Sequence, residues 1–152
     1  ELLMGDKSIP AHRDYYWFCD VHTRWQDNDV YGHINNVQYY SYFDTVANRY
    51  LIEFGGLDIQ AGQQIGYIVH SECHYPRSAA FPEPLIGGFR VNRIGNSSVE
   101  YGLAIFEANA SDDSTAIAQG RLTHVFVDRD SEKPLTIEGR LRDALEAAIK
   151  PL

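Results

Sequence analysis

The sequence predicts an α+β fold, in which one long helix packs on a curved antiparallel sheet of about five strands. The hydrophobic pattern shows alternation first, then a helical period, and then alternation in later segments. Turn residues at Gly95-Asn96 and Ser111-Asp112-Asp113 separate the later segments, which should therefore form antiparallel hairpins. No alternation of strands and helices follows, which argues against a doubly wound fold.

The first strand is predicted over residues 16–25, where apolar and polar side chains alternate. The long helix follows Asn36, because large apolar residues recur at helical spacing as far as Phe54. Gly55-Gly56 ends this pattern. The helix would make about five turns at 3.6 residues each.

Later strands are predicted over residues 67–75, 85–94, 99–108 and 115–127. On the last strand, the small residues Ala118 and Gly120 precede bulkier residues on the same face. This arrangement would let the helix approach the sheet closely at one end. Residues 138–149 are amphipathic and predict a short terminal helix.

The 152 residues, of which 44% are hydrophobic, suffice for one core and do not require a second domain. We divide the chain into an N-terminal extension, residues 1–15, and a single domain, residues 16–152. The net charge of -8 argues against nucleic acid or an anionic membrane as the main partner. No apolar run approaches the roughly 20 residues that cross a bilayer, and we expect a cytoplasmic protein.

The segment 24–36 contains two carboxylates, Asp27 and Asp29, and then a glycine and His33 directly before the helix. A carboxylate can act as base or nucleophile, and free N–H groups at a helix start can stabilise an oxyanion. His33 could serve as a ligand or general acid. The segment also has a structural interpretation, because Asp and Asn side chains shape turns and cap helices.

No residue pattern indicates a metal or cofactor site. The histidines in strand patterns do not support a metal site, and Cys19 and Cys73 have neither metal-like nor redox spacing. We expect both cysteines to be buried thiols. The chain lacks a Gly-x-Ser-x-Gly motif, and Gly55-Gly56 and Gly87-Gly88 do not match a phosphate loop. We therefore predict no metal and no cofactor, and we disfavour serine or cysteine hydrolysis.

Two segments resemble the hot-dog fold acyl-CoA thioesterases, in the branch typified by 4-hydroxybenzoyl-CoA thioesterase. They are Asp27-Asn28-Asp29-Val30-Tyr31-Gly32-His33-Ile34-Asn35-Asn36, followed by the aromatic helix, and Tyr75-Pro76-Arg77-Ser78-Ala79 with Pro84-Leu85 further on. The resemblance covers about residues 16–145. The second segment is the less specific, because Phe81-Pro82-Glu83-Pro84 stands where family members often have a Gly-Asp turn.

The resemblance implies a homodimer or homotetramer that forms its active sites at the interface and hydrolyses acyl-CoA to free acid and CoA without a cofactor. It places Asp29 at the catalytic carboxylate, as general base or nucleophile, and the backbone N–H of Asn36 at the thioester carbonyl. His33 and Asn35 would be pocket or water-positioning groups. Asp27 is the competing carboxylate and otherwise a substrate contact.

The phosphates of CoA require polar and basic partners even on an acidic protein. By resemblance we expect the nucleotide part of CoA at the turn between the middle strands, with Arg77 as a second contact. The turn residues are Arg93, Asn96, Ser97 and Ser98. An ordinary solvated surface is the alternative for each. Tyr31 and the helix aromatics would line an acyl tunnel, although such residues also pack a helix against a sheet.

Two other functions remain open. One is a non-catalytic acyl-CoA or lipid-binding module on the same fold, because a fold alone does not confer activity. The other is a hot-dog dehydratase, which we disfavour because such enzymes pair a catalytic histidine with a separate carboxylate or amide in a different motif.

Overall fold

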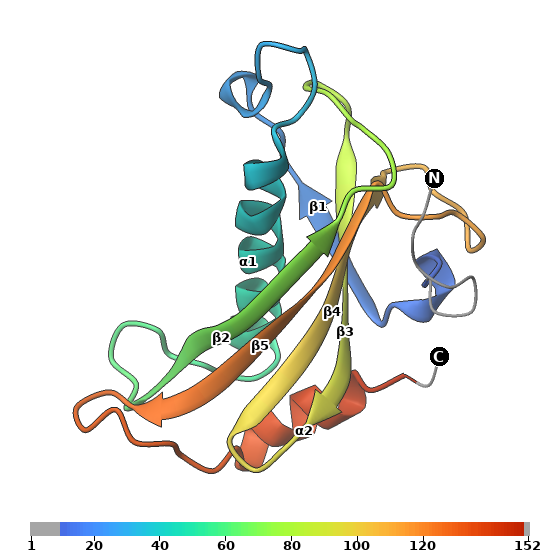
Figure 1. Ribbon diagram of the computed structural model, residues 1–152. Coiled ribbons are helices and arrows are strands. Elements are labelled where there is room, and N and C mark those ends of the chain that lie inside the picture. The colour runs from blue at the N-terminus through green and yellow to red at the C-terminus, as the bar shows by residue number, and fades with distance from the viewer. Residues whose placement is uncertain (1–9, 151–152) are drawn as a thin grey trace.

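The computed structural model describes residues 10–150, in which a long helix lies across one face of a five-stranded antiparallel sheet (Figure 1). In chain order the elements are the 3-10 helix η2 (His12–Asp14), β1 (Trp17–Val21), the 3-10 helix η3 (Trp25–Asp27), α1 (Asn36–Glu53), β2 (Gln64–His74), β3 (Leu85–Ile94), β4 (Ser98–Glu107), β5 (Ala118–Asp128) and α2 (Gly139–Ala147). The strand order is β1-β3-β4-β5-β2, so β1 and β2 are the edges. The predicted α+β fold is confirmed.

Helix α1 begins at Asn36 because Asn35 caps it. The side-chain oxygen of Asn35 accepts a hydrogen bond from the N–H of Val37 at 3.0 Å. Tyr50 on the buried face of the helix stacks on Phe89 of β3, with ring centroids 4.2 Å apart. The buried side chains of this face are Tyr39, Tyr42, Phe43, Val46, Ala47, Tyr50 and Leu51. Burial of this face against the sheet holds the helix in place.

Two glycines allow α1 to lie close to the sheet. A Cβ atom at Gly120 of β5 would lie 2.9 Å from the ring of Phe43. A Cβ atom at Gly87 of β3 would collide with Val46. The close approach predicted from small residues on the last strand is therefore confirmed, and Gly87 provides a second such point on β3.

Both predicted hairpins are present, since β3–β4 and β4–β5 pair antiparallel. The first strand ends at Val21 and not at residue 25, because the Asp27 carboxylate accepts a hydrogen bond from the Arg24 N–H at 3.0 Å and stabilises η3. The last strand begins at Ala118, because the backbone at Thr115 bridges Ala11 instead of continuing the β4–β5 ladder. These two boundaries were predicted wrongly.

Residues 1–9 of the predicted N-terminal extension lie outside the described residues, whereas residues 10–15 contact the sheet. Tyr15 is buried beside Phe106 of β4, with ring centroids 5.7 Å apart. Cys19 is buried and Cys73 is partly buried. Within residues 10–150, no helix has the length and apolar character needed to cross a membrane.

Candidate active site

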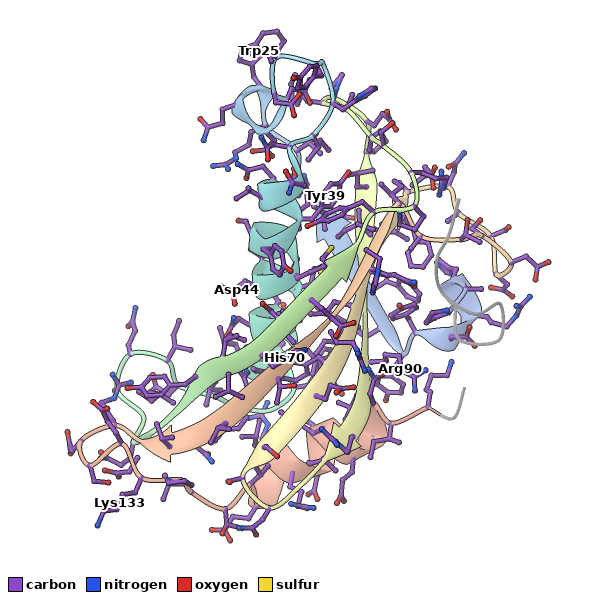
Figure 2. All side chains as sticks on the ribbon, in the orientation of Figure 1. Trp25, Tyr39, Asp44, His70, Arg90 and Lys133 are labelled. Atoms are coloured by element: carbon purple, nitrogen blue, oxygen red, sulfur yellow. The ribbon has the colours of Figure 1, made fainter. Side chains whose placement is uncertain are left out.

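The loop between β1 and α1 meets the segment between β2 and β3 at one end of the sheet, the upper end in Figure 1. The N–H of Ile34 donates to the carbonyl of Ala79 at 2.8 Å, and the N–H of Phe81 donates to the Asn28 side-chain oxygen at 3.0 Å. Trp25 lies at the outer end of the loop in Figure 2, and its ring meets that of Phe81 edge-on at 6.1 Å. The two segments that carry the resemblance are therefore in direct contact.

Asp27 lies beneath this loop with its side chain fully buried. One carboxylate oxygen accepts a 2.6 Å hydrogen bond from the Tyr42 hydroxyl, and the other accepts one from Nε of Arg24 at 3.1 Å. Burial alone would raise the pKa of Asp27, but the hydrogen bonds from Tyr42 and Arg24 hold that pKa below its usual value. This burial argues against direct substrate contact and for a supporting role.

Asp29 occupies a tight turn on the outer side of the same loop. One of its side-chain oxygens accepts a hydrogen bond from the N–H of Tyr31 at 2.9 Å, and its own N–H donates to the carbonyl of His33 at 2.9 Å. Gly32 closes the turn with a φ of +83°, where a side chain would be strained. The second side-chain oxygen of Asp29 has no hydrogen-bond partner among residues 10–150. The turn-forming interpretation is therefore correct, and it leaves one oxygen for chemistry.

The helix start supplies a backbone donor near this turn. Asn35 is the capping residue, and its N–H donates to the carbonyl of Asp27 at 2.9 Å. Asn36 is the first helical residue, and its N–H has no acceptor within the described part of the chain. Such an unpaired donor at the positive end of a helix suits a developing negative charge. Asn35 thus shapes the site, whereas Asn36 presents the free N–H.

The helix tyrosines were expected to line an acyl tunnel or to pack the helix, but their contact with Asp27 was not predicted. Tyr42 holds Asp27, and the Tyr75 hydroxyl lies 3.4 Å from the carbonyl of Asn36. Tyr39 packs edge-on against Tyr42 at 5.8 Å between ring centroids. Tyr39 and Tyr42 are buried, which favours the packing interpretation of these helix aromatics. Only the helical spacing of Tyr39 and Tyr42 could have indicated that they share a face.

His33 and Tyr31 extend from the same loop and are exposed, with 84% of Tyr31 accessible. Neither side chain has a hydrogen-bond partner among the described residues. Both side chains are therefore free to meet a ligand, and nothing in the fold fixes their direction.

The predicted CoA contacts at the β3–β4 turn lie at the opposite end of the sheet from Asp29, beside α2 (Figure 1). Backbone groups of this turn already form hydrogen bonds within the chain. The carbonyl of Ser97 accepts a hydrogen bond from the N–H of Phe126 at 2.8 Å, and the carbonyl of Asn96 accepts one from the N–H of Ile137 at 2.7 Å. Ser98 closes the turn through its carbonyl, and Arg93 lies 3.8 Å from Glu100. One protomer alone does not bring this turn to the Asp29 loop.

Arg77 lies closer to the loop, but its guanidinium is engaged. It forms a two-pronged ion pair with Glu107, at 2.5 Å and 3.0 Å, and donates to the carbonyl of Thr115 at 2.7 Å. The hydrogen bonds to Glu107 raise the pKa of Arg77. The observed geometry ties the segment after β2 to β4, so a phosphate would have to compete with Glu107 for Arg77.

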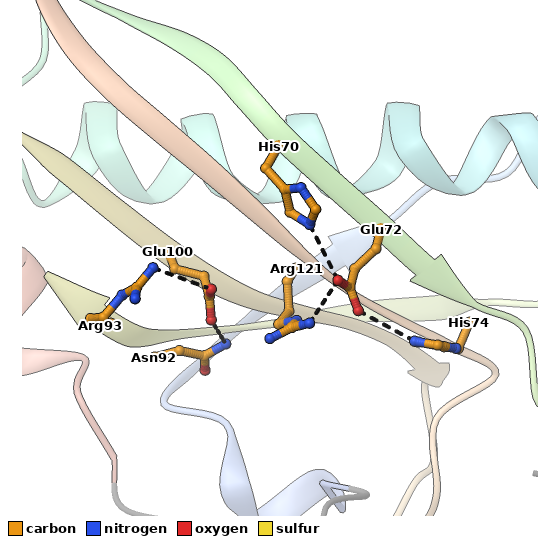
Figure 3. Close-up of polar contacts among 7 residues, drawn as sticks. All are labelled: His70, Glu72, His74, Asn92, Arg93, Glu100 and Arg121. Carbon is orange, nitrogen blue, oxygen red and sulfur yellow. Dashed lines mark hydrogen bonds and ion pairs between the residues drawn. The ribbon is translucent and has the colours of Figure 1, made fainter. Parts of the chain in front are cut away.

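A separate group of charged side chains lies on the sheet face away from α1 (Figure 3). Glu72 accepts a 2.7 Å hydrogen bond from Arg121 and is flanked by His70 and His74 at 3.2 Å and 3.4 Å. The bond from Arg121 lowers the pKa of Glu72 to about 2. Glu72, His74 and Arg121 line a cavity of about 520 Å³ with Arg90. Within residues 10–150, no cluster of three suitable side chains could hold a metal ion.

Known proteins are similar to this one in sequence and in fold. Residues 23–145 match the thioesterase-like superfamily. The long-chain acyl-CoA thioesterase FadM of Escherichia coli (strain K12) is 24% identical over 123 residues, which cover 80% of this chain and 91% of FadM.

Two solved structures extend the comparison. The PA5185 protein of Pseudomonas aeruginosa strain PAO1 is 51% identical, has a TM-score of 0.89, and the match covers 93% of this chain and 97% of that one. A 1,4-dihydroxy-2-naphthoyl-CoA thioesterase from Synechocystis has the same fold at a TM-score of 0.74, with 14% identity and coverage of 84% and 93% of the two chains. The sequence match extends over most of the chain and the hot-dog architecture agrees with it, so this protein belongs to the thioesterase-like superfamily.

Proposed function

We propose that this protein is an acyl-CoA thioesterase that hydrolyses a thioester to the free acid and CoA. The observation that carries the proposal is the pairing, in one loop, of an unbonded Asp29 oxygen with the unpaired N–H of Asn36. An acyl-CoA thioesterase among its relatives, FadM, supports CoA as the carrier. Water, a carboxylate and a backbone donor suffice for this chemistry, and the proposal includes no cofactor.

In the proposed reaction the N–H of Asn36 binds the thioester carbonyl oxygen, which becomes negatively charged as the carbonyl carbon is attacked. Asp29 either takes a proton from the attacking water or attacks the carbon itself to form a mixed anhydride. In both routes the carbon–sulfur bond breaks. In the first, Asp29 passes the proton that it took from water to the sulfur, and CoA leaves as the thiol. In the second, CoA leaves as the thiolate, which takes a proton from the solvent, and water then cleaves the anhydride and restores the Asp29 carboxylate. Asp27 supports the helix start, and His33 and Tyr31 border the approach to Asp29.

The edge strand β2 provides the surface for a homodimer. Its outer backbone edge pairs with no strand among the described residues, and it exposes apolar side chains, with 60% of Val69 accessible. A long apolar edge of this kind is a template for pairing with another chain. A two-fold axis would pair two copies of β2 antiparallel. Each Asp29 loop would then lie at the same end as the β3–β4 turn of the second copy, from which the predicted CoA contacts could come.

The dimer proposal is tested with Val69→Pro, because a proline in an edge strand disfavours pairing with another strand. Light scattering on a sizing column should show a particle of half the wild-type mass, and hydrolysis should fall with it. Ile52→Thr is the control, because Ile52 is exposed in the last turn of α1, far along the helix from Asn36. A Val69→Pro protein with unchanged mass would refute β2 as the interface.

Asp29→Asn tests the catalytic assignment. Hydrolysis of acyl-CoA should fall by about a hundredfold or more, because acid–base groups contribute on that scale. Circular dichroism and CoA binding should stay unchanged. Asp20→Asn is the matched control, since Asp20 is an exposed carboxylate on β1. A variant that keeps more than roughly a tenth of the wild-type rate would rule out this role for Asp29.

The same purified protein distinguishes hydrolysis from binding alone. A panel of acyl-CoAs mixed with a thiol reagent reports free CoA as it forms. Release of CoA supports the thioesterase. Binding without release would favour the non-catalytic module, and a product that keeps its thioester, identified by mass spectrometry, would favour the dehydratase.

A further inference from the structure

A cavity of about 160 Å³ lies between the second half of α1, the loop after it and the beginning of β2. A water molecule occupies about 30 Å³ in the liquid, so the cavity has room for roughly five water molecules or a chemical group of that volume. Its lining mixes apolar and polar side chains: Asn48, Leu57, Ile59, Gln64, Ile65, Gly66 and His124. The mechanism proposed above uses none of these residues.

His124 is the buried polar group of this lining, with only 4% of its surface exposed. Its Nδ1 lies 2.8 Å from the hydroxyl of Tyr101, which is itself fully buried. Burial lowers the pKa of His124 to about 4, so the imidazole is neutral near pH 7. A neutral imidazole carries one donor and one acceptor nitrogen.

The proton on the imidazole can be placed from the surroundings of Tyr101. The Tyr101 hydroxyl has no other acceptor among the described residues, and it therefore donates to Nδ1. The ring proton then lies on Nε2, which has no hydrogen-bond partner in the described part of the chain. His124 lines the cavity, so this N–H is a donor that an acceptor atom of a ligand in the cavity could take.

Two amides complete the polar side of the cavity. The Asn48 nitrogen donates to the backbone carbonyl of Asp44 at 2.8 Å, while the Asn48 side-chain oxygen has no donor among the described residues. The side-chain amide of Gln64 likewise has no hydrogen bond within residues 10–150. The cavity therefore offers both donors and acceptors, which fits a hydroxyl or carbonyl group better than a methyl group.

The cavity connects to the reaction through the proposed dimer. Antiparallel pairing of two β2 strands would bring Gln64 at the start of one strand beside His74 at the end of the other. Tyr75 follows His74, and its hydroxyl lies at the carbonyl of Asn36, where α1 begins. The cavity of one copy would thus adjoin the helix start of the other.

We propose that this cavity, with His124, Asn48 and Gln64, receives the far end of the acyl group and selects acyl groups that end in a hydrogen-bonding oxygen. The inference rests on the proposed thioesterase function and deepens it, because it names the substrate class. An oxygen at the acyl end accepts from His124 Nε2, and a hydroxyl also donates to the amide oxygens. A methyl end fills the same volume and leaves these groups unpaired.

The test compares kcat/KM for matched pairs of butanoyl, hexanoyl and octanoyl CoA thioesters with and without a terminal hydroxyl. Wild-type protein should prefer the hydroxyl-ended member of at least one pair by about tenfold, which corresponds to roughly one hydrogen bond. Asn48→Leu and His124→Phe should each reduce that ratio by about tenfold. Asn109→Leu, an exposed amide in the β4–β5 turn, should leave the ratio unchanged.

Each outcome decides the inference. If the wild type treats both members of every pair alike, or prefers the methyl end throughout, the polar subsite is refuted while the thioesterase stands. If the preference exists but both variants keep it, this cavity is not its source. If His124→Phe fails to fold by circular dichroism, Asn48→Leu alone decides. If no thioester releases CoA, the proposed function itself fails and the inference fails with it.

Discussion

Replacing Tyr42 by Phe removes one hydroxyl from beneath the Asp29 loop and changes nothing else in the shape of the side chain. That hydroxyl donates a 2.6 Å hydrogen bond to the fully buried carboxylate of Asp27. Arg24 still supplies its backbone and side-chain bonds in the variant, so Asp27 loses one of its partners and stays charged. The variant should therefore have a lower free energy of unfolding, and the start of α1 should shift.

The size of the effect follows from the charge on the acceptor. A hydrogen bond to a charged group contributes about 1.5–3 kcal/mol, more than a neutral one. For a chain of this length each kcal/mol shifts the midpoint of thermal unfolding by about 2–4 °C. Tyr42→Phe should therefore lower Tm by roughly 3–12 °C.

The pH dependence of stability provides a second test of this hydrogen bond. The pKa of Asp27 is lowered in the folded chain, so its contribution is present above the ordinary Asp value of 3.8 and is lost as the pH falls through the lower, folded pKa. The Tyr42 bond is one cause of that lowering. The difference between wild type and Tyr42→Phe should therefore shrink in acid.

Urea unfolding followed by circular dichroism measures the change at neutral pH and again in acid. Tyr31→Phe is the matched control, because the Tyr31 hydroxyl is exposed and has no partner among the described residues. The control should unfold like the wild type. A Tyr42→Phe protein within about 0.5 kcal/mol of wild type at neutral pH would refute this account of the buried carboxylate.

Two further perturbations test the interior. Burial holds the pKa of His124 at about 4 in the folded chain, whereas the unfolded chain has the ordinary value of 6.5. As the pH falls below 6.5, His124 is therefore protonated in the unfolded chain before it is protonated in the folded one. The contribution of His124 to the free energy of unfolding should be complete above pH 6.5, and about 3 kcal/mol of it should be lost toward pH 4. Urea unfolding of His124→Gln should not show this loss. Gly87→Ala places a methyl group against Val46 and should destabilise the chain by about 1–3 kcal/mol. Val46→Ala in the same chain should recover part of this loss, and a Gly87→Ala protein as stable as wild type would contradict the close contact.

Local patterns were sufficient to predict most of the fold. The change of period after Asn36 and the turns at residues 95–96 and 111–113 identified α1 and both hairpins, because each depends on neighbours in sequence. The order of the strands was not predicted. Pairing of β2 with β5, which leaves β2 at the edge, depends on contacts between residues far apart in the chain.

The site was predicted less completely than the fold. Spacing and resemblance placed Asp29 and Asn36 in one loop, but they could not show that Asp27 is buried. Its partner Tyr42 is 15 residues away, and their contact exists only once α1 is packed against the loop. Within one protomer the β3–β4 turn lies at the other end of the sheet from Asp29, so the CoA contacts expected at this turn stay a prediction.

The bond from Phe81 to the Asn28 side chain, with that from Ile34 to Ala79, has a consequence for engineering. The loop that carries Asp29 does not hold its shape through its own residues alone. A chimera that transfers residues 24–36 to a related scaffold should therefore need residues 75–84 from the same donor. Recombination between these two blocks would separate the Asp29 loop from the segment that supports it, so they are best exchanged together.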